Sequence, residues 1–211
     1  GANTYLLQQF FSPHSNRRQD SWGGSREKRT RFPIEVLTKV QHVVAEKEAS
    51  HFIIGYRFSP EEIEEPGIRF EDTMFLLNTL AEYEPDYFHI SANSYQRTSI
   101  VNQEDTEPLI NKYLKMQSAQ LAKIPLIGVG SIAQRQDAEH ALELGYNLLS
   151  VGKAYLVEPQ WTDKISQNEE VEQFVDIHDQ KVLHIPSPLW KVMDFMILDK
   201  EEEHRKYERL K

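Results

Sequence analysis

Residues 125–153 read PLIGVGSIAQRQDAEHALELGYNLLSVGK, a pattern typical of an α/β fold. Apolar residues run over 125–129 and again over 147–151, which predicts two short buried strands. Between them, residues 133–144 have helical spacing and stop at Gly145, a residue type that commonly follows a helix C-terminus. A strand, a helix and a second strand in this order predict a parallel sheet covered by helices.

The same alternation continues towards the N-terminus. Residues 51–58 and 87–90 form two further apolar runs, which predict buried strands of the same sheet. Helical spacing over 70–83 and 109–121 supplies the helices that follow them. The chain therefore predicts about four parallel strands with flanking helices.

A longer helix is predicted ahead of these strands, over residues 26–47, with Ser25 as its N-cap. Pro33 lies near its start. Proline is tolerated in the first turn of a helix, where its missing N–H would have no partner. If Pro33 does not fall in that turn, we expect the helix to begin later than Arg26.

Small residues and a lysine follow the last two predicted strands. The first of these strands leads into Gly130 and Ser131, and the second into Gly152 and Lys153. In parallel α/β folds, ligands bind beyond the carboxyl ends of the strands, and in eight-stranded barrels a phosphate site often follows the last two. Small residues let backbone N–H groups approach a phosphate. The pattern fits a phosphate site as well as it fits two tight turns.

One charged residue, Arg57, interrupts the apolar run that ends at Phe58. A charge in such a strand costs free energy unless it meets an anionic or polar partner. Either Arg57 faces the open end of the sheet and binds a ligand, or it forms a structural salt bridge.

The composition excludes several classes of function. The 211 residues carry a formal net charge of −9, whereas a nucleic-acid surface is normally basic. The chain has no cysteine, so disulfides and thiolate metal sites are excluded, and its histidines and acids lack a metal-ligand spacing near the N-terminus. No apolar run approaches the roughly 18 residues of a membrane span. We therefore expect no metal, nucleic-acid or membrane partner, and a reducing compartment such as the cytoplasm.

The N-terminal segment carries the most specific pattern. Residues 1–25 read GANTYLLQQFFSPHSNRRQDSWGGS. They resemble the signature of the old yellow enzymes, which runs roughly His-Gly-Ala-(His/Asn)-Gly-Tyr-Leu, Gln-Phe-Leu-Ser-Pro, Ser-Asn-x-Arg-x-Asp and Gly-Gly-Ser. Residues 55–60 are similar to the arginine strand of that family, and residues 128–131 and 151–153 to its two phosphate-binding strand ends. The resemblance covers about residues 1–160 and, more loosely, the chain through Trp190.

This resemblance implies a (β/α)8 barrel that binds FMN non-covalently. NADH or NADPH passes a hydride to the flavin, which then reduces a small-molecule acceptor such as an activated C=C bond. By position, Asn3 is similar to the second of two residues that hydrogen-bond the acceptor oxygen, and Tyr5 to the proton donor, since a phenol keeps its proton at neutral pH. Arg57 resembles the residue beside flavin N1, which stabilises negative charge on the reduced ring. The residues that resemble the FMN phosphate site are Gly130, Ser131, Gly152 and Lys153.

Three departures from the family pattern stand out. The first histidine of the signature would lie just before Gly1. Thr4 replaces the usual glycine, which we expect to shift Tyr5. Lys153 replaces the usual arginine, so it pairs with phosphate as a point charge without the bidentate fork.

The number of predicted strands indicates half a barrel, since a closed barrel needs eight. We expect residues 1–184 to form the C-terminal half of an FMN-binding barrel, and residues 185–211 a helical tail. Half a barrel would expose strand edges and an apolar inner face, so we expect the chain to self-associate and to be inactive alone.

Two alternatives to a flavin-dependent oxidoreductase stay open. One is a flavin-independent phosphate-binding barrel enzyme such as an aldolase, for which Lys153 is the candidate Schiff-base residue. The other is a catalytically incomplete fragment that associates with itself without binding FMN.

Overall fold

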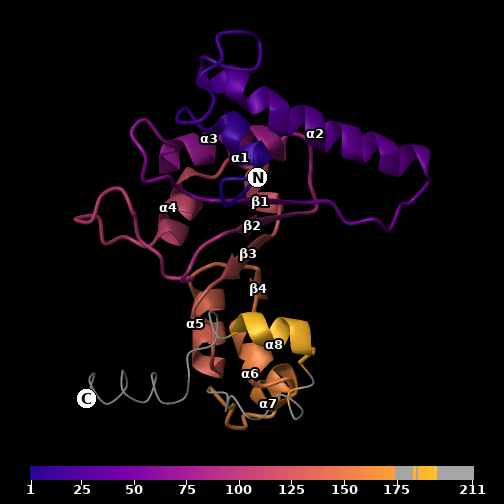
Figure 1. The fold of residues 1–211 in the computed structure, drawn as a ribbon, viewed down its shortest axis with the longest axis vertical. Helices are drawn as coiled ribbons and strands as arrows, with labels where there is room; N and C mark the ends of the chain where they lie inside the picture. The colour runs from indigo at the N-terminus through magenta and orange to yellow at the C-terminus, as the bar shows by residue number, and fades with distance from the viewer. Residues whose placement is uncertain (174–182, 184, 194–211) are drawn as a thin grey trace. The chain divides into compact units, whose positions relative to one another are not determined.

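The computed structural model of the protein describes residues 1–173, 183 and 185–193. Its sheet has four strands in the order β1-β2-β3-β4, and each neighbouring pair is parallel (Figure 1). The predicted parallel sheet with flanking helices is confirmed. The strands are β1 (Gly55–Phe58), β2 (Tyr87–Ile90), β3 (Leu126–Val129) and β4 (Leu148–Ser150).

Helices separate the strands along the chain. The predicted helix N-cap is correct, because Oγ of Ser25 accepts a hydrogen bond from the backbone of Lys28. The α-helices are α1 (Leu6–Phe11), α2 (Arg26–Glu46), α3 (Phe70–Ala81), α4 (Leu109–Met116), α5 (Arg135–Glu143), α6 (Lys153–Val157), α7 (Trp161–Ser166) and α8 (Ser187–Met193), and Leu121–Lys123 forms the short 3-10 helix η1.

The chain divides into two compact units. The first contains residues 1–130 and 141–150 and holds the whole sheet. The second contains residues 131–140 and 151–211. Within the second unit Ile185 is buried against Val157 of α6, so the described part of the proposed 185–211 tail packs on the residues before it. The rest of that tail, from residue 194, lies outside the described residues.

The sheet has one buried and one open face. Tyr56, Phe58, Phe88 and Ile90 are at most 5% exposed, whereas Arg57, between two of them, is exposed. Successive side chains of a strand point to opposite faces, so the alternation in β1 and β2 separates a core face from a face that carries the polar groups. The ligand was expected beyond the carboxyl ends of these strands, and Arg57 lies next to the last residue of β1.

Two predicted boundaries were wrong. The strand predicted over 51–58 begins only at Gly55, where pairing with β2 starts. Phe52 and Ile53 are 60% and 69% exposed, and no strand of the described residues covers them. The helix predicted over 109–121 ends at Met116, and its polar continuation leads into η1. An amphipathic pattern alone does not locate where a helix ends.

Pro33 was also misplaced. The helix α2 does begin at Arg26, yet Pro33 lies in its third turn and not in the first. A proline there removes one backbone hydrogen bond. Pro33 is among the most deeply buried residues of the first unit, and packing against neighbouring groups offsets that loss.

Among the described residues, no helix is long and apolar enough to cross a membrane. The same part of the chain contains no group of three or more histidine or acidic side chains that could hold a metal ion.

Candidate functional site

The turn formed by Asn3, Thr4 and Tyr5 precedes α1. Asn3 and Thr4 have φ angles of 56° and 61°, in the left-handed region that favours glycine. Asparagine tolerates this conformation, whereas in threonine the branched Cβ makes it sterically unfavourable. This explains why the family pattern has glycine at position 4. The turn must therefore be held in place by contacts around it.

Asn3 connects the turn to the carboxyl ends of two strands. Its backbone N–H donates to Oγ of Ser59, 2.9 Å away, directly after β1. Its side-chain Oδ1 accepts a hydrogen bond of 2.8 Å from Oγ of Ser91, directly after β2. Because Oδ1 is engaged, the exposed Nδ2 group is left as a hydrogen-bond donor. Asn3 thus lies where a ligand of a parallel sheet is expected.

Tyr5 is the N-cap of α1, and its side chain is 75% exposed. Its backbone N–H donates to the carbonyl of Ala2 at 3.2 Å. Within the described residues its hydroxyl has no hydrogen-bond partner, so the phenol is free to meet a small molecule.

Arg57 lies beside His89 on the open face of the sheet. The two residues are paired between β1 and β2. Arg57 is exposed, and it forms no ion pair with any described residue. Among the described residues nothing supports the salt-bridge interpretation of Arg57, and its exposed side chain is compatible with ligand binding.

His89 is a functional candidate that the sequence interpretation missed. Burial, and then the neighbouring charge of Arg57, lower the pKa of His89. Its Nε2 atom is buried and has no hydrogen-bond partner among the described residues. The sequence alone does not reveal this candidate, because His89 stands out only once the strand pairing places it in register with Arg57.

Gly130 and Ser131 follow β3, at the boundary of the two compact units. Gly130 has a φ of +97°, and a Cβ atom there would lie 2.5 Å from the backbone of Asn93 and 2.6 Å from that of Ser94. Glycine is thus required at this position by the local packing, whether or not a phosphate binds. Ser131 is exposed and has a φ of 53°.

Gly152 and Lys153 belong to the second unit, where Gly152 is the N-cap of α6 and Lys153 its first residue. Apart from its two chain neighbours, no described residue has an atom within 4 Å of a Cβ built on Gly152, so its backbone is open to a ligand. Both residues are exposed. An accessible backbone next to a lysine fits the phosphate group of FMN.

The structure thus brings part of the predicted site together. Asn3, Tyr5 and Arg57 all belong to the first unit, and Asn3 is bonded across the ends of β1 and β2. Ser131, Gly152 and Lys153 belong to the second unit.

Two buried carboxylates behind the turn were also missed. Glu61 and Glu62 are each 8% exposed. Glu61 accepts hydrogen bonds from Oγ of Ser99 and from the backbone of Ile100, at 2.9 and 2.8 Å. Glu62 accepts one from the side chain of Gln8. A Glu-Glu pair after a Ser-Pro turn looks solvent-exposed in sequence, so nothing in the pattern signalled their burial.

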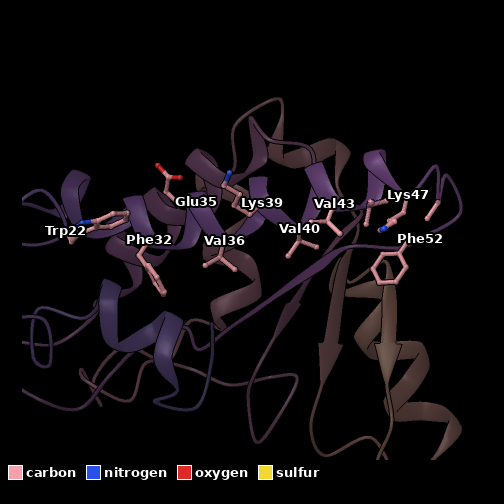
Figure 2. Close-up of a pocket in the computed structure, with 11 residues that line it drawn as sticks. Trp22, Phe32, Glu35, Val36, Lys39, Val40, Val43, Lys47 and Phe52 are labelled. Atoms are coloured by element: carbon pink, nitrogen blue, oxygen red, sulfur yellow. The ribbon is translucent and has the colours of Figure 1, made fainter.

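A separate apolar groove of about 690 Å³ runs along α2 (Figure 2). Phe32, Val36 and Val40 point into it from one side of the helix, and Phe52 lies near its far end. Its lining is almost entirely apolar, with charged groups only at the rim. Apart from the rim, the groove has few polar groups that could orient a reacting molecule, so it is not the candidate site.

Comparison with known proteins agrees with this geometry. The family model described as "NADH:flavin oxidoreductase / NADH oxidase family" matches residues 1–172. The chain is 61% identical to an NADH:acrylate oxidoreductase of Vibrio harveyi over its whole length, and 51% identical to an NADH:fumarate oxidoreductase of Klebsiella pneumoniae over 94% of it. A probable NADH-dependent flavin oxidoreductase of Bacillus subtilis is 39% identical over 92% of the chain.

The chain spans only part of these relatives: 21% and 22% of the first two, and 52% of the third. Among solved structures, morphinone reductase is 21% identical and superposes with a TM-score of 0.60, covering 82% of this chain and 43% of that one. The old yellow enzyme homologue from Zymomonas mobilis has a TM-score of 0.61 and covers 82% of this chain and 46% of its own.

These similarities confirm the resemblance to old yellow enzymes and the fold predicted as the C-terminal half of their barrel. They also count against a flavin-independent aldolase or isomerase. From the signature at residues 1–25 to the strand ends that carry the glycines, the chain belongs to the NADH:flavin oxidoreductase / NADH oxidase family.

Proposed function

We propose that these residues form part of an FMN-dependent NADH oxidoreductase whose acceptor is an alkene conjugated to a carboxylate or carbonyl group. The observation that carries the proposal is the bond from Ser91 to Oδ1 of Asn3, which leaves Nδ2 of this exposed residue as a donor. The exposed phenol of Tyr5 lies two residues further along the chain. The acceptors in the names of the two most similar relatives above, acrylate and fumarate, belong to this chemical class.

The two side chains have complementary roles in such a reduction. The Nδ2 group of Asn3 donates a hydrogen bond to the acceptor oxygen and stabilises the negative charge that develops there when a hydride adds to the alkene. The phenol of Tyr5 gives its proton to the other alkene carbon, so that one hydride and one proton together saturate the C=C bond.

FMN, when bound, accepts a hydride from NADH and donates it to the acceptor. Arg57 lies on the open sheet face, where its positive charge would stabilise an anionic flavin ring. The lowered pKa of His89 keeps that neighbour uncharged, so Arg57 is the cation of this pair. Gly130, Ser131, Gly152 and Lys153 would hold the phosphate through backbone N–H groups and the lysine charge.

The test is a purified protein that carries the complete barrel with these residues. We expect a yellow protein whose flavin is bleached by NADH without oxygen and recovers its colour when acrylate, fumarate or an enone is added. NADPH serves as the comparison reductant. A colourless protein that ignores added FMN would refute the proposal, and bleaching without recovery by any conjugated alkene would refute the acceptor class.

We also propose that the 211 residues alone self-associate. Within the described residues β1 has no neighbour on its outer edge, and the exposed side chains of Val43 and Phe52 line the groove of α2. Apolar surface beside an unpaired strand edge favours association. Size-exclusion chromatography at micromolar concentration should show a species larger than a monomer, and replacement of Val43 and Phe52 with serine should reduce it. We retain the cytoplasm as the proposed location, and the boundary between 184 and 185 stays a prediction.

A further inference from the structure

Gln8 connects the Asn3–Tyr5 turn to a buried carboxylate. Gln8 lies in α1 and is 3% exposed. Its Nε2 donates to Oε1 of Glu62 at 2.8 Å, and its Oε1 accepts the backbone N–H of Thr4 at 3.1 Å. One amide side chain therefore joins the turn to a residue 54 positions away in sequence.

Glu62 determines which way the amide of Gln8 points. A carboxylate oxygen accepts hydrogen bonds and donates none, so the NH2 end of Gln8 must face Glu62. The other end of Gln8, its carbonyl oxygen, is then directed at the N–H of Thr4. The second oxygen of Glu62 accepts from Oγ of Ser12 at 2.6 Å and from the backbone of Ile68 at 3.0 Å, which holds the carboxylate in place.

The turn needs this support because of its backbone conformation. Thr4, with its positive φ, would readily leave the left-handed region if its N–H were released. Nε2 of Gln9 donates to the carbonyl of Thr4 at 2.7 Å, so the peptide units before and after Thr4 are each held by a side chain of α1. Asn3 and Tyr5 flank Thr4, and any rotation there would move the amide and the phenol relative to each other.

We propose that Gln8 and Glu62 are positioning residues that set the direction of the Asn3 amide and the Tyr5 phenol by holding the N–H of Thr4. Neither side chain contacts the acceptor. The inference rests on the proposed function for its kinetic consequence. The structural part, a Thr4 amide held by an oriented Gln8, stands without it.

The test compares Gln8→Leu with Ser12→Ala in the complete barrel protein. Both remove a hydrogen bond to Glu62, yet only the first releases Thr4. In Gln8→Leu, we expect hydrogen exchange at the Thr4 amide to rise about tenfold, the factor that corresponds to 1.4 kcal/mol. We expect KM for the acceptor to rise and kcat to fall by a similar factor, with an unchanged Kd for FMN. Ser12→Ala should lower Tm without either effect.

Glu62→Gln is the second variant, because it keeps the volume of the side chain and folds with the least disturbance. Its NH2 group would face either Nε2 of Gln8 or the backbone N–H of Ile68, both of which are donors. The amide of Gln8 is then oriented less firmly, so we expect Thr4 exchange and acceptor KM to change in the direction seen for Gln8→Leu, by a smaller factor. Equal effects of Gln8→Leu and Ser12→Ala, or an unchanged Thr4 amide in Gln8→Leu, would overturn the inference. A wild-type protein without NADH-dependent reduction would instead refute the proposed function, while the exchange experiment would still report on the turn.

Discussion

Arg57 and His89 lie side by side on neighbouring parallel strands, and the imidazole of His89 keeps a buried Nε2 without a partner among the described residues. Burial disfavours the charged imidazolium, and the guanidinium of Arg57 disfavours it further. The pair therefore places one permanent positive charge on the open sheet face.

The first prediction concerns the pH dependence of stability. The pKa of His89 is lower in the folded protein than its ordinary value of 6.5. As the pH falls, the imidazole therefore takes up a proton in the unfolded chain before it does so in the folded protein. The contribution of His89 to the free energy of unfolding should be fully present above about pH 6.5 and decrease below it. His89→Gln should remove this part of the decrease. Urea unfolding at several pH values measures it, and parallel curves for both proteins would contradict the prediction.

Asn3→Gly removes the amide donor while keeping a residue that adopts the positive φ of 56°. We expect kcat/KM for the acceptor to fall by roughly 10²-fold, the loss seen when one donor to a developing oxyanion is removed. FMN content should stay unchanged. Steady-state kinetics with acrylate and an enone, together with the flavin absorbance, test this, and an unaltered kcat/KM would exclude Asn3 as the donor.

Tyr5→Phe deletes only the phenolic oxygen. We expect the flavin to be reduced by NADH at the wild-type rate, whereas its reoxidation by the acceptor slows by roughly 10²–10⁴-fold, as for a lost general acid. Tm should not change, because the exposed hydroxyl has no hydrogen bond to any described residue, and such surface changes cost within about 0.5 kcal/mol. Stopped-flow absorbance separates the two half-reactions; a slowed NADH step with normal reoxidation would reverse the assignment.

Two glycine substitutions should give opposite results. In Gly130→Ala the new Cβ would meet the backbone of Asn93 and Ser94, and the φ of +97° is unfavourable for alanine, so we expect destabilisation of about 1–3 kcal/mol. In Gly152→Ala the new Cβ would have no atom of another described residue within 4 Å, apart from the two chain neighbours, so Tm should stay unchanged. If the backbone of Gly152 approaches the FMN phosphate, the Gly152→Ala protein should bind FMN more weakly than the wild type. Thermal unfolding and FMN titration, each on both variants, distinguish packing from ligand approach.

Lys153 should act through its charge. Lys153→Ala should weaken FMN binding by about 10–100-fold, since hydrogen bonds to charged groups contribute about 1.5–3 kcal/mol. Lys153→Arg should bind FMN at least as tightly as the wild type, because the guanidinium adds a bidentate geometry. Lys39→Ala, at the rim of the α2 groove, serves as the control. Isothermal titration with FMN gives the three affinities, and equal values for Lys153→Ala and Lys39→Ala would remove Lys153 from the site.

Local patterns of residue type predicted the elements because their causes are local. The apolar runs before Gly130 and Gly152, and the helical spacing between them, identified β3, α5 and β4 within a few residues. The hydroxyl of Ser25 identified the start of α2. The sequence did not predict the true start of β1, because Phe52 and Ile53 are as apolar as the strand itself. Only the position of β2 shows where pairing begins.

By itself, the sequence determined the family and the parallel order of strand and helix, because residue identity and spacing specify these directly. It also proposed Asn3, Tyr5, Arg57 and Lys153 as side chains of the site. Only the tertiary structure decided what each of them faces. It paired Arg57 with His89, bonded Asn3 to Ser91 across 88 positions, and buried Glu62 behind Gln8. Such contacts depend on strand register and chain crossing, and these follow from the packing of the whole sheet and not from any short segment.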